Sequence, residues 1–145
     1  WSSPPGGGTT DYAVEIYHKA LEDQSYECFL SADTMLPMMY MDDAIRATIE
    51  IMEAPASKIK VRSSYNLAGM SFTPAQMAES IRLEMGDFSI SYAPDFRQKI
   101  ADSWPNSIDD SFAKNDWGWQ PSFDLKATTQ TMLDALRTMD YELET

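Results

Sequence analysis

Residues 1–14 read WSSPPGGGTTDYAV, a glycine-rich loop that runs through two threonines and an aspartate into an amphipathic segment. Three consecutive glycines allow positive φ angles and let the backbone approach a ligand closely. Thr9, Thr10 or Asp11 can then cap a helix whose unpaired N–H groups and dipole favour a carboxylate or phosphate. The stretch therefore predicts a loop-to-helix start that either binds a ligand or simply caps the helix.

Downstream periodicity predicts helices that alternate with short strands, which favours an α/β fold. Expected strands cover residues 26–30, 38–40, 63–67 and 88–92. Expected helices have apolar faces made by Ala13, Ile16, Tyr17 and Ala20, by Ile45, Ile49 and Met52 after a cap at Asp42 or Asp43, and by Leu125, Thr129, Met132, Leu133, Leu136 and Met139 after a cap at Asp124. No internal repeat interrupts this order, so the pattern indicates one α/β unit.

The clearest helix start lies at residues 72–77, FTPAQM. Thr73 can cap the helix, Pro74 suits its first turn and Gln76 can complete a capping box. This helix is expected to end near Gly86, where a glycine can leave the helical conformation.

Four patterns in order extend this interpretation: PPGGGTTDYAV, ADTMLPMMYMDDAIRATIEIMEAP, YNLAGMSFTPAQMA, and IADSWPNSIDDS followed by DWGW. They resemble the carboxy-terminal portion of the short-chain-type, NAD-dependent L-threonine 3-dehydrogenases, which are extended, epimerase/dehydratase-like short-chain dehydrogenases. The resemblance runs from Trp1 to about Leu136. It implies the edge of a Rossmann-like sheet together with a small, mostly helical substrate lobe, over residues 1–139, and we interpret residues 140–145 as an acidic tail.

Two hallmarks of that family are missing from the sequence. No G-x-G-x-x-G or G-x-x-G-x-x-G pattern occurs, and none of the seven tyrosines is followed by a lysine four residues later. The chain also begins at Trp1 rather than at a methionine. We therefore expect it to be the back part of a larger enzyme, whose dinucleotide-binding half and proton-transferring tyrosine are absent or lie on a separate polypeptide.

The resemblance also implies roles for four residues. The loop-to-helix start at Thr9, Thr10 and Asp11 would face the active cleft and hold the polar ends of an amino-acid substrate, although these residues could equally act only as a cap. Trp104, in the SWP motif, would close an aromatic wall over the substrate, and its alternative role is packing. Trp117 and Trp119 are expected to pack around Gly118.

By the same resemblance, the whole enzyme oxidises the 3-hydroxyl of L-threonine with NAD to give 2-amino-3-ketobutyrate. The missing tyrosine would take the hydroxyl proton, the missing lysine would lower the pKa of that tyrosine, and hydride would pass to the nicotinamide. This chain would orient and desolvate the substrate. Its expected partners are L-threonine, the amino-terminal nucleotide-binding half and further copies in a homo-oligomer, in the cytoplasm or alternatively the mitochondrial matrix.

Two other classes of function stay open. A nucleotide-sugar epimerase or dehydratase needs arginines for its pyrophosphate; residues 35–40, MLPMMY, carry none at the first expected place, and Arg97 and Asp102 keep only part of the second motif. A non-catalytic binding module would explain the missing catalytic pair without a second half. A small zwitterionic substrate is favoured over a nucleotide sugar.

Charge and cysteine content narrow the partners further. The net charge of −12 would repel nucleic acid and anionic membranes, so neither is expected as a partner. Cys28 is the single cysteine and His18 the single histidine, which excludes an internal disulfide and makes a metal site unexpected. We expect Cys28 to be a buried structural thiol in a reducing compartment.

Overall fold

The computed structural model of the chain describes residues 6–143, except for the side chains of residues 140–143; the first part of the glycine-rich loop, residues 1–5, lies outside this range. The described elements follow in the order α1 (Tyr12–Asp23), β1 (Ser25–Cys28), β2 (Leu36–Met38), α2 (Met41–Glu53), β3 (Met70–Phe72), α3 (Pro74–Met85), β4 (Ser89–Tyr92), α4 (Phe96–Ala101), α5 (Ser111–Trp117) and α6 (Leu125–Leu143). β1 pairs in parallel with β4, and β2 pairs antiparallel with β3. The fold is α/β, as predicted, mostly helical and with a small parallel sheet.

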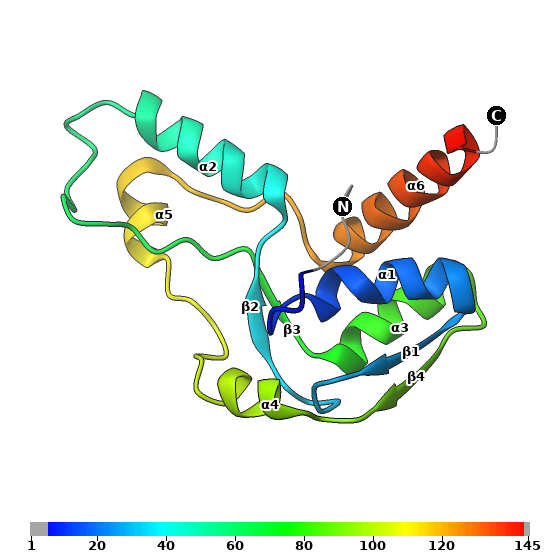
Figure 1. Ribbon diagram of the computed structural model, residues 1–145. Coiled ribbons are helices and arrows are strands. Elements are labelled where there is room, and N and C mark those ends of the chain that lie inside the picture. The colour runs from blue at the N-terminus through cyan, green and yellow to red at the C-terminus, as the bar shows by residue number, and fades with distance from the viewer. Residues whose placement is uncertain (1–5, 144–145) are drawn as a thin grey trace.

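The elements form two groups in space. Figure 1 shows α1, α3 and α6 gathered beside the β1–β4 pair, whereas α2 and α5 lie together at the other end of the molecule. β2 and β3 connect the two groups. The glycine-rich loop enters α1 near this connection, so the start of α1 lies where the two groups meet.

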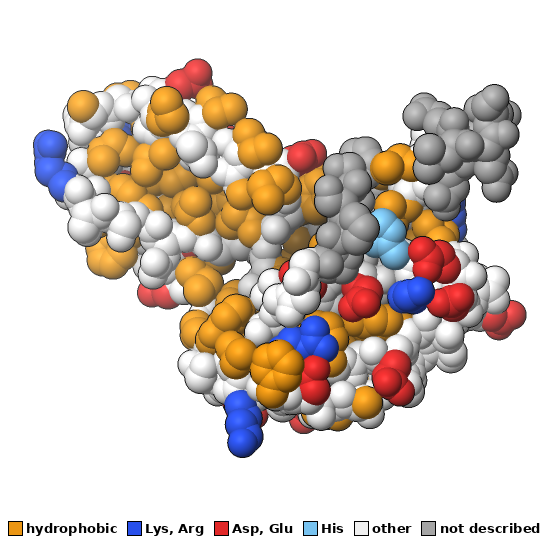
Figure 2. Space-filling view, in the orientation of Figure 1, with side chains coloured by type: hydrophobic (Ala, Val, Ile, Leu, Met, Phe, Trp, Pro, Cys, Tyr) orange, Lys and Arg blue, Asp and Glu red, His pale blue; other side chains and the backbone are white. Residues whose placement is uncertain are grey.

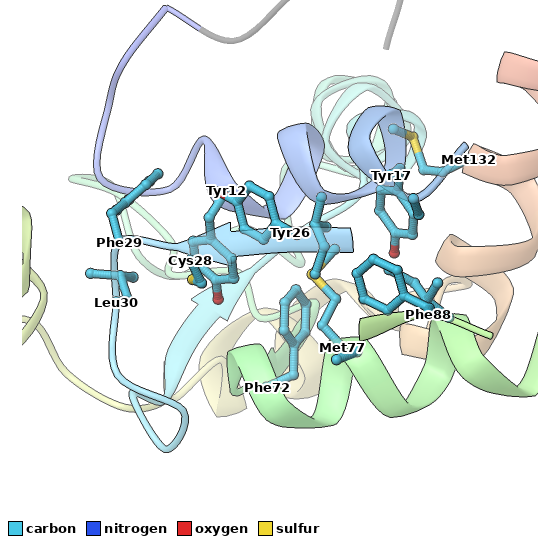
Figure 3. Packing of buried hydrophobic residues seen from close by; sticks show 14 of the residues in the cluster. Tyr12, Tyr17, Tyr26, Cys28, Phe29, Leu30, Phe72, Met77, Phe88 and Met132 are labelled. Carbon is cyan, nitrogen blue, oxygen red and sulfur yellow. The ribbon is translucent and has the colours of Figure 1, made fainter. Parts of the chain in front are cut away.

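The larger core forms around the inner face of α1. Its side chains Ile16, Tyr17 and Ala20 are buried, as the periodicity predicted, and Figure 3 shows the aromatic rings of this cluster packed between α1 and α3. The Tyr17 hydroxyl shares a hydrogen bond with Thr129 Oγ1 on α6 at 3.0 Å, and Ser80 Oγ on α3 donates to the same oxygen at 2.8 Å. Three helices are therefore joined by one buried and satisfied polar cluster, which fixes α1 and the loop before it.

The predicted start of α3 is confirmed. Thr73 Oγ1 accepts from the backbone N–H of Gln76 at 3.2 Å, and Gln76 Oε1 accepts from the backbone N–H of Thr73 at 2.9 Å, which completes the capping box. The helix ends at Met85, just before Gly86. Asp124 likewise caps α6, because its carboxylate accepts from the N–H of Ala127 at 2.8 Å.

The predicted cap of α2 was wrong. This helix begins at Met41, after an extended Tyr40, so Asp42 and Asp43 already lie in its first turn. Asp43 is only 1% exposed, and its carboxylate accepts hydrogen bonds from the backbone N–H groups of Ser122 at 2.9 Å and Phe123 at 3.0 Å. Arg46 donates to it at 2.7 Å. The carboxylate caps a distant loop rather than its own helix, and thereby fixes α2 to the segment that leads into α6.

We expect Asp43→Ala to destabilise the fold by about 1–3 kcal/mol, because it leaves partly buried backbone donors and the Arg46 guanidinium without their acceptor. Burial pushes the pKa of the Asp43 carboxyl up, but hydrogen bonds from Arg46, Phe123 and Ser122 outweigh burial and hold the pKa below its ordinary value. The stabilisation is therefore complete above the unfolded-state pKa of about 4 and is lost as pH falls through the lower folded-state pKa. Denaturant unfolding at pH 7 and at pH 3 measures both effects.

Asp43→Asn is the matched control for this prediction, since it keeps the shape of the side chain and one acceptor oxygen. It should cost less than Asp43→Ala and should remove the acid-dependent part of the loss. Equal stabilities of the wild type and Asp43→Ala at pH 7 would contradict the role assigned to this carboxylate.

The two predicted strands that form the parallel pair are confirmed. β1 covers residues 25–28 where residues 26–30 were expected, and β4 covers residues 89–92 where residues 88–92 were expected. The strand expected at residues 38–40 lies slightly earlier, in β2. The strand expected at residues 63–67 was wrong: this segment has no strand partner within the described chain, and the strand follows in β3. A Cβ at Gly69 would lie 2.6 Å from Met38 O, so only glycine permits the close approach with which the β2–β3 pairing starts.

A second, smaller core holds the other group of elements together. Trp119 is fully buried against Ala47 of α2 and Ala113 of α5, and its Nε1 donates to Ala68 O at 3.0 Å. Trp117 lies beside it, with the two rings 5.9 Å apart, and Gly118 between them ends α5 in the left-handed conformation at φ +86°. The predicted packing role of both tryptophans is confirmed.

The backbone of the predicted acidic tail is partly helical. α6 continues to Leu143 and so enters the segment 140–145. The side chains of that segment lie outside the described residues, so its solvated character stays a prediction. Within residues 6–143, no helix is long and apolar enough to cross a membrane.

Candidate functional site

The glycine-rich loop folds back on itself at the start of α1. Asp11 directly precedes the helix, but its carboxylate does not cap the α1 backbone as expected; instead its Oδ2 accepts from the N–H of Gly8 at 2.7 Å. The carbonyl of Asp11 accepts from Val14 and Glu15, and that of Thr10 from Ala13, so the first turn of α1 is formed by backbone contacts. The carboxylate of Asp11 is thus held at the mouth of the loop by the loop itself.

On one side of Asp11 lies a cavity of about 330 Å³ with mostly charged walls. We call it the acidic cavity. It is lined by Gly7, Asp11, Glu15, Glu27, Phe29, Ala93, Asp95 and Arg97. Four carboxylates face one guanidinium there, so the cavity as a whole favours a cationic group over an anion.

The single cation of the acidic cavity is already paired. Arg97 donates to both carboxylate oxygens of Asp95, with the closest contact at 2.6 Å, and its guanidinium carbon lies 3.2 Å from the centre of the Phe29 ring. Hydrogen bonding from Arg97 lowers the pKa of Asp95. The Tyr26 hydroxyl donates to Glu15 at 3.0 Å, and burial, followed by this carboxylate, raises the pKa of Tyr26. Because its guanidinium is already paired, Arg97 attracts an incoming anion only weakly. The carboxylates of Glu27 and Asp11 remain able to accept hydrogen bonds from a cationic group.

On the other side of Asp11 lies a cavity of about 360 Å³ with mostly hydrophobic walls, which we call the apolar cavity. It is lined by Thr10, Asp11, Ala13, Val14, Tyr17, Met38, Met39, Tyr40, Met41, Met70, Phe72, Met77, Thr128 and Met132. Its walls combine the start of α1 with β2, β3 and α6. Asp11 belongs to both cavities, so one carboxylate borders a charged and a hydrophobic compartment.

The four residues predicted from sequence are only partly brought together. Thr10 and Asp11 are neighbours on the apolar cavity, and Thr9 precedes them in the same turn, half-buried and lining neither cavity. Trp104 lies in the irregular loop after α4, with its N–H bonded to Ala101 O, and also lines neither cavity. Its side chain is 41% exposed, so it does not pack in the core of the described chain.

Several residues of the site were missed in the sequence. Glu15 lies one helical turn after Asp11, and this spacing could have identified it as a neighbour on the same face. Glu27 and Asp95 come from β1 and from the loop after β4, and only the parallel pairing of these strands places them beside Asp11. The methionines of the apolar cavity likewise come from separate parts of the chain, namely β2 and the residue after it, α2, β3, α3 and α6.

Metal and thiol chemistry find no support in the described part of the chain. No group of three or more acidic, histidine or cysteine side chains among residues 6–139 is arranged to hold a metal ion. Cys28 is fully buried, as predicted, and burial raises the pKa of its thiol, which disfavours the nucleophilic thiolate.

A dinucleotide does not fit the described residues by themselves. The site would need a strand that runs through a glycine-rich turn into a helix. α1 is the one helix here that follows several glycines, and α1 is preceded by a turn at residues 9–11 and not by a strand.

Comparison with known proteins identifies close relatives. The chain is 51% identical over 133 residues to the mitochondrial L-threonine 3-dehydrogenase of Bos taurus, covering 91% of this chain and 35% of the bovine one. It is 51% identical to an uncharacterised epimerase/dehydratase of Staphylococcus saprophyticus, covering 42% of that protein. No family model matches the chain.

Solved structures agree with these relatives. The GalE-like L-threonine dehydrogenase of Cupriavidus necator, in its apo form, superposes with a TM-score of 0.89 at 60% identity, and the match covers 93% of this chain and 49% of that one. The L-threonine dehydrogenase of Phytophthora infestans gives a TM-score of 0.92 at 48% identity, over 95% of this chain and 45% of that one. The chain thus spans between about a third and a half of the length of the relatives it matches.

Proposed function

We propose that this chain forms the substrate side of an enzyme that oxidises L-threonine with NAD. The premise is that the chain belongs to the extended short-chain dehydrogenases, as a carboxy-terminal portion of the L-threonine 3-dehydrogenase type. The product would be 2-amino-3-ketobutyrate. The amino-terminal half would bind NAD and carry the tyrosine and lysine that this chain lacks. A homo-oligomeric state and a cytoplasmic location stay predictions, and the mitochondrial name belongs to the bovine relative.

The observation that carries this proposal is that Asp11 lines two unlike cavities, with Thr10 beside it on the apolar cavity. L-Threonine has an ammonium, a carboxylate and a methyl-bearing carbon, so its site must offer both charge and apolar surface. The Asp11 carboxylate can accept from the ammonium, the Thr10 hydroxyl can bond to a polar end, and the positive dipole end of α1 favours the substrate carboxylate. The methionine-rich wall beside Thr10 can exclude water from the methyl side.

Trp104 is the second element of the proposed site. Its exposed indole is available to contact a partner outside this chain, because it is not used in either core of the described residues. In the whole enzyme we assign it to an aromatic wall over the substrate, where it would keep water away from the reacting carbon. Thr9 would support the glycine-rich loop that carries Thr10 and Asp11.

A nucleotide sugar fits this site less well. Its pyrophosphate requires free cationic donors. Arg97 is the one cation on the acidic cavity, it is paired with Asp95, and Asp11, Glu15 and Glu27 surround it. Four carboxylates against one arginine would repel a pyrophosphate, and the same charges suit an ammonium.

The function can be tested with a chimaera in which this chain follows the amino-terminal half of the Cupriavidus necator enzyme. NAD reduction would be measured for the chimaera, for this chain alone and for the amino-terminal half alone. We expect reduction with L-threonine in the chimaera only. Activity with a nucleotide sugar in place of L-threonine would favour the epimerase/dehydratase alternative, and L-threonine binding by the isolated chain without NAD would favour an independent binding module.

A further inference from the structure

The helix that precedes Trp104 has little apolar contact with the rest of the described chain. α4 is only six residues long, and Ala101 is its one buried side chain. Phe96 is 72% exposed and Ile100 is 40% exposed, and Figure 2 shows hydrophobic side chains on the surface at the place of α4, near the bottom of the view. Because a helix this short is not stable by itself, its position must depend largely on polar contacts.

Gln98 lies in the middle of α4 and makes such contacts with both ends of its side-chain amide. Its Oε1 accepts from the backbone N–H of Ser31 at 2.8 Å. Its Nε2 donates to Thr34 Oγ1 at 3.0 Å and to Asp102 Oδ1 at 2.6 Å. One side chain thus joins the segment after β1 to α4 and to the residue that follows this helix.

Gln98 is also connected to the loop that carries Trp104. The backbone N–H of Asp102 donates to the carbonyl of Gln98 at 2.9 Å, and the N–H of Trp104 donates to Ala101 O at 3.0 Å. The side chains of residues 102–107 are all exposed. Since none of these side chains is fixed by burial, the position of the Trp104 indole depends on how the loop leaves α4.

The other end of α4 belongs to the acidic cavity. Asp95 caps the helix by accepting from the N–H of Arg97 at 2.8 Å, and both residues line that cavity. α4 therefore connects a wall of the acidic cavity with the loop of Trp104. A shift of α4 would change how these two parts of the proposed site lie relative to each other.

We propose that Gln98 is a positioning residue for the reaction, because by tying α4 to Ser31 and Thr34 it holds the indole of Trp104 over the substrate. The inference rests on the proposed function, which assigns Trp104 to the substrate side. Gln98 lines neither the acidic cavity nor the apolar cavity, so it acts through Trp104 and not by contact with the substrate.

A double-mutant cycle in the chimaera tests this role. Gln98→Ala should lower kcat on the order of 10-fold and change KM for L-threonine by less than about 2-fold, because the indole shifts while both cavities keep their residues. In the Trp104→Ala background the same substitution should change kcat by less than about 2-fold, because the group that Gln98 positions is already gone. Lys99→Ala, at an exposed position of the same helix, is the matched control and should leave kcat unchanged in both backgrounds.

Hydrogen exchange in the chain by itself gives a measurement that does not depend on catalysis. Gln98→Ala should speed the exchange of the Asp102 and Trp104 amides at least about 10-fold, because the end of α4 that holds them loosens. The amides of α3 should keep their wild-type rates. Lys99→Ala should change neither set of amides.

Two results would overturn the inference. One is a loss of kcat from Gln98→Ala that is as large in the Trp104→Ala background as in the wild type. The other is an exchange rate of the Asp102 and Trp104 amides that is the same in Gln98→Ala and the wild type, or that rises together with the rates of α3, as a residue that only stabilises the fold would give. A chimaera that does not oxidise L-threonine at all would contradict the proposed function, and the exchange rates would still decide whether Gln98 holds the loop of Trp104.

Discussion

Trp104→Ala in the chimaera should lower kcat on the order of 10²-fold, even at saturating L-threonine. Loss of the indole would open the aromatic wall, admit water and loosen the geometry in which the hydroxyl and the catalytic groups meet, and small misplacements of that kind cost rates of this size. Because Trp104 is 41% exposed in this chain and lies in neither core, the substitution should leave the melting temperature almost unchanged. Steady-state kinetics and thermal unfolding of the same preparations measure both quantities.

Trp104→Phe serves as the matched variant, since it keeps an aromatic ring in the same loop and should recover part of the lost kcat. A tryptophan that only packs would give the opposite pattern: a lower melting temperature with kcat per folded molecule intact. That pattern would remove Trp104 from the substrate side.

Thr10→Ala should lower kcat/KM for L-threonine roughly 5- to 150-fold. The lost polar contact would cost the transition state about 1–3 kcal/mol, which corresponds to this factor. Thr10 lines the apolar cavity next to Asp11, so removal of its hydroxyl takes a donor and acceptor from the wall of that cavity. The backbone of the loop should persist, because the first turn of α1 is held by the carbonyls of Thr10 and Asp11. Initial rates over a range of L-threonine concentrations give the value.

Thr10→Ser keeps the hydroxyl and should retain most of the wild-type kcat/KM. If Thr10→Ala and Thr10→Ser are equally impaired, the hydroxyl is not the group that matters. The residue would then act through the shape of the loop.

Local signals in the sequence were sufficient for α1, α3 and α6, whereas the short helices α4 and α5 were not predicted. The start of α3 was predicted because Thr73 and Gln76 lie three residues apart and satisfy each other's backbone N–H groups, so no distant residue is needed. The buried faces of α1 and α6 followed from the helical period in the same way. In each case the information lies within a few turns of the chain.

Distant partners account for what the sequence did not predict. Asp43 resembled a cap, but its donors are the backbone N–H groups of Ser122 and Phe123, which only the folded chain brings near. Residues 63–67 have the composition of a strand, yet a strand exists only where another strand pairs with it. The acidic cavity combines residues of α1, β1 and the loop after β4, so its charge balance could not be read from any one motif.

The most direct test of the central claim, that this chain holds the substrate and not the cofactor, is the dissociation constant of NAD for the chimaera. We expect Thr10→Ala and Trp104→Ala to bind NAD as tightly as wild type, within about 2-fold, while their L-threonine kinetics are impaired as described. Both side chains are assigned to the substrate in the proposed function, so neither should contribute to cofactor affinity. An equal loss of NAD affinity and of L-threonine turnover in both variants would contradict the account.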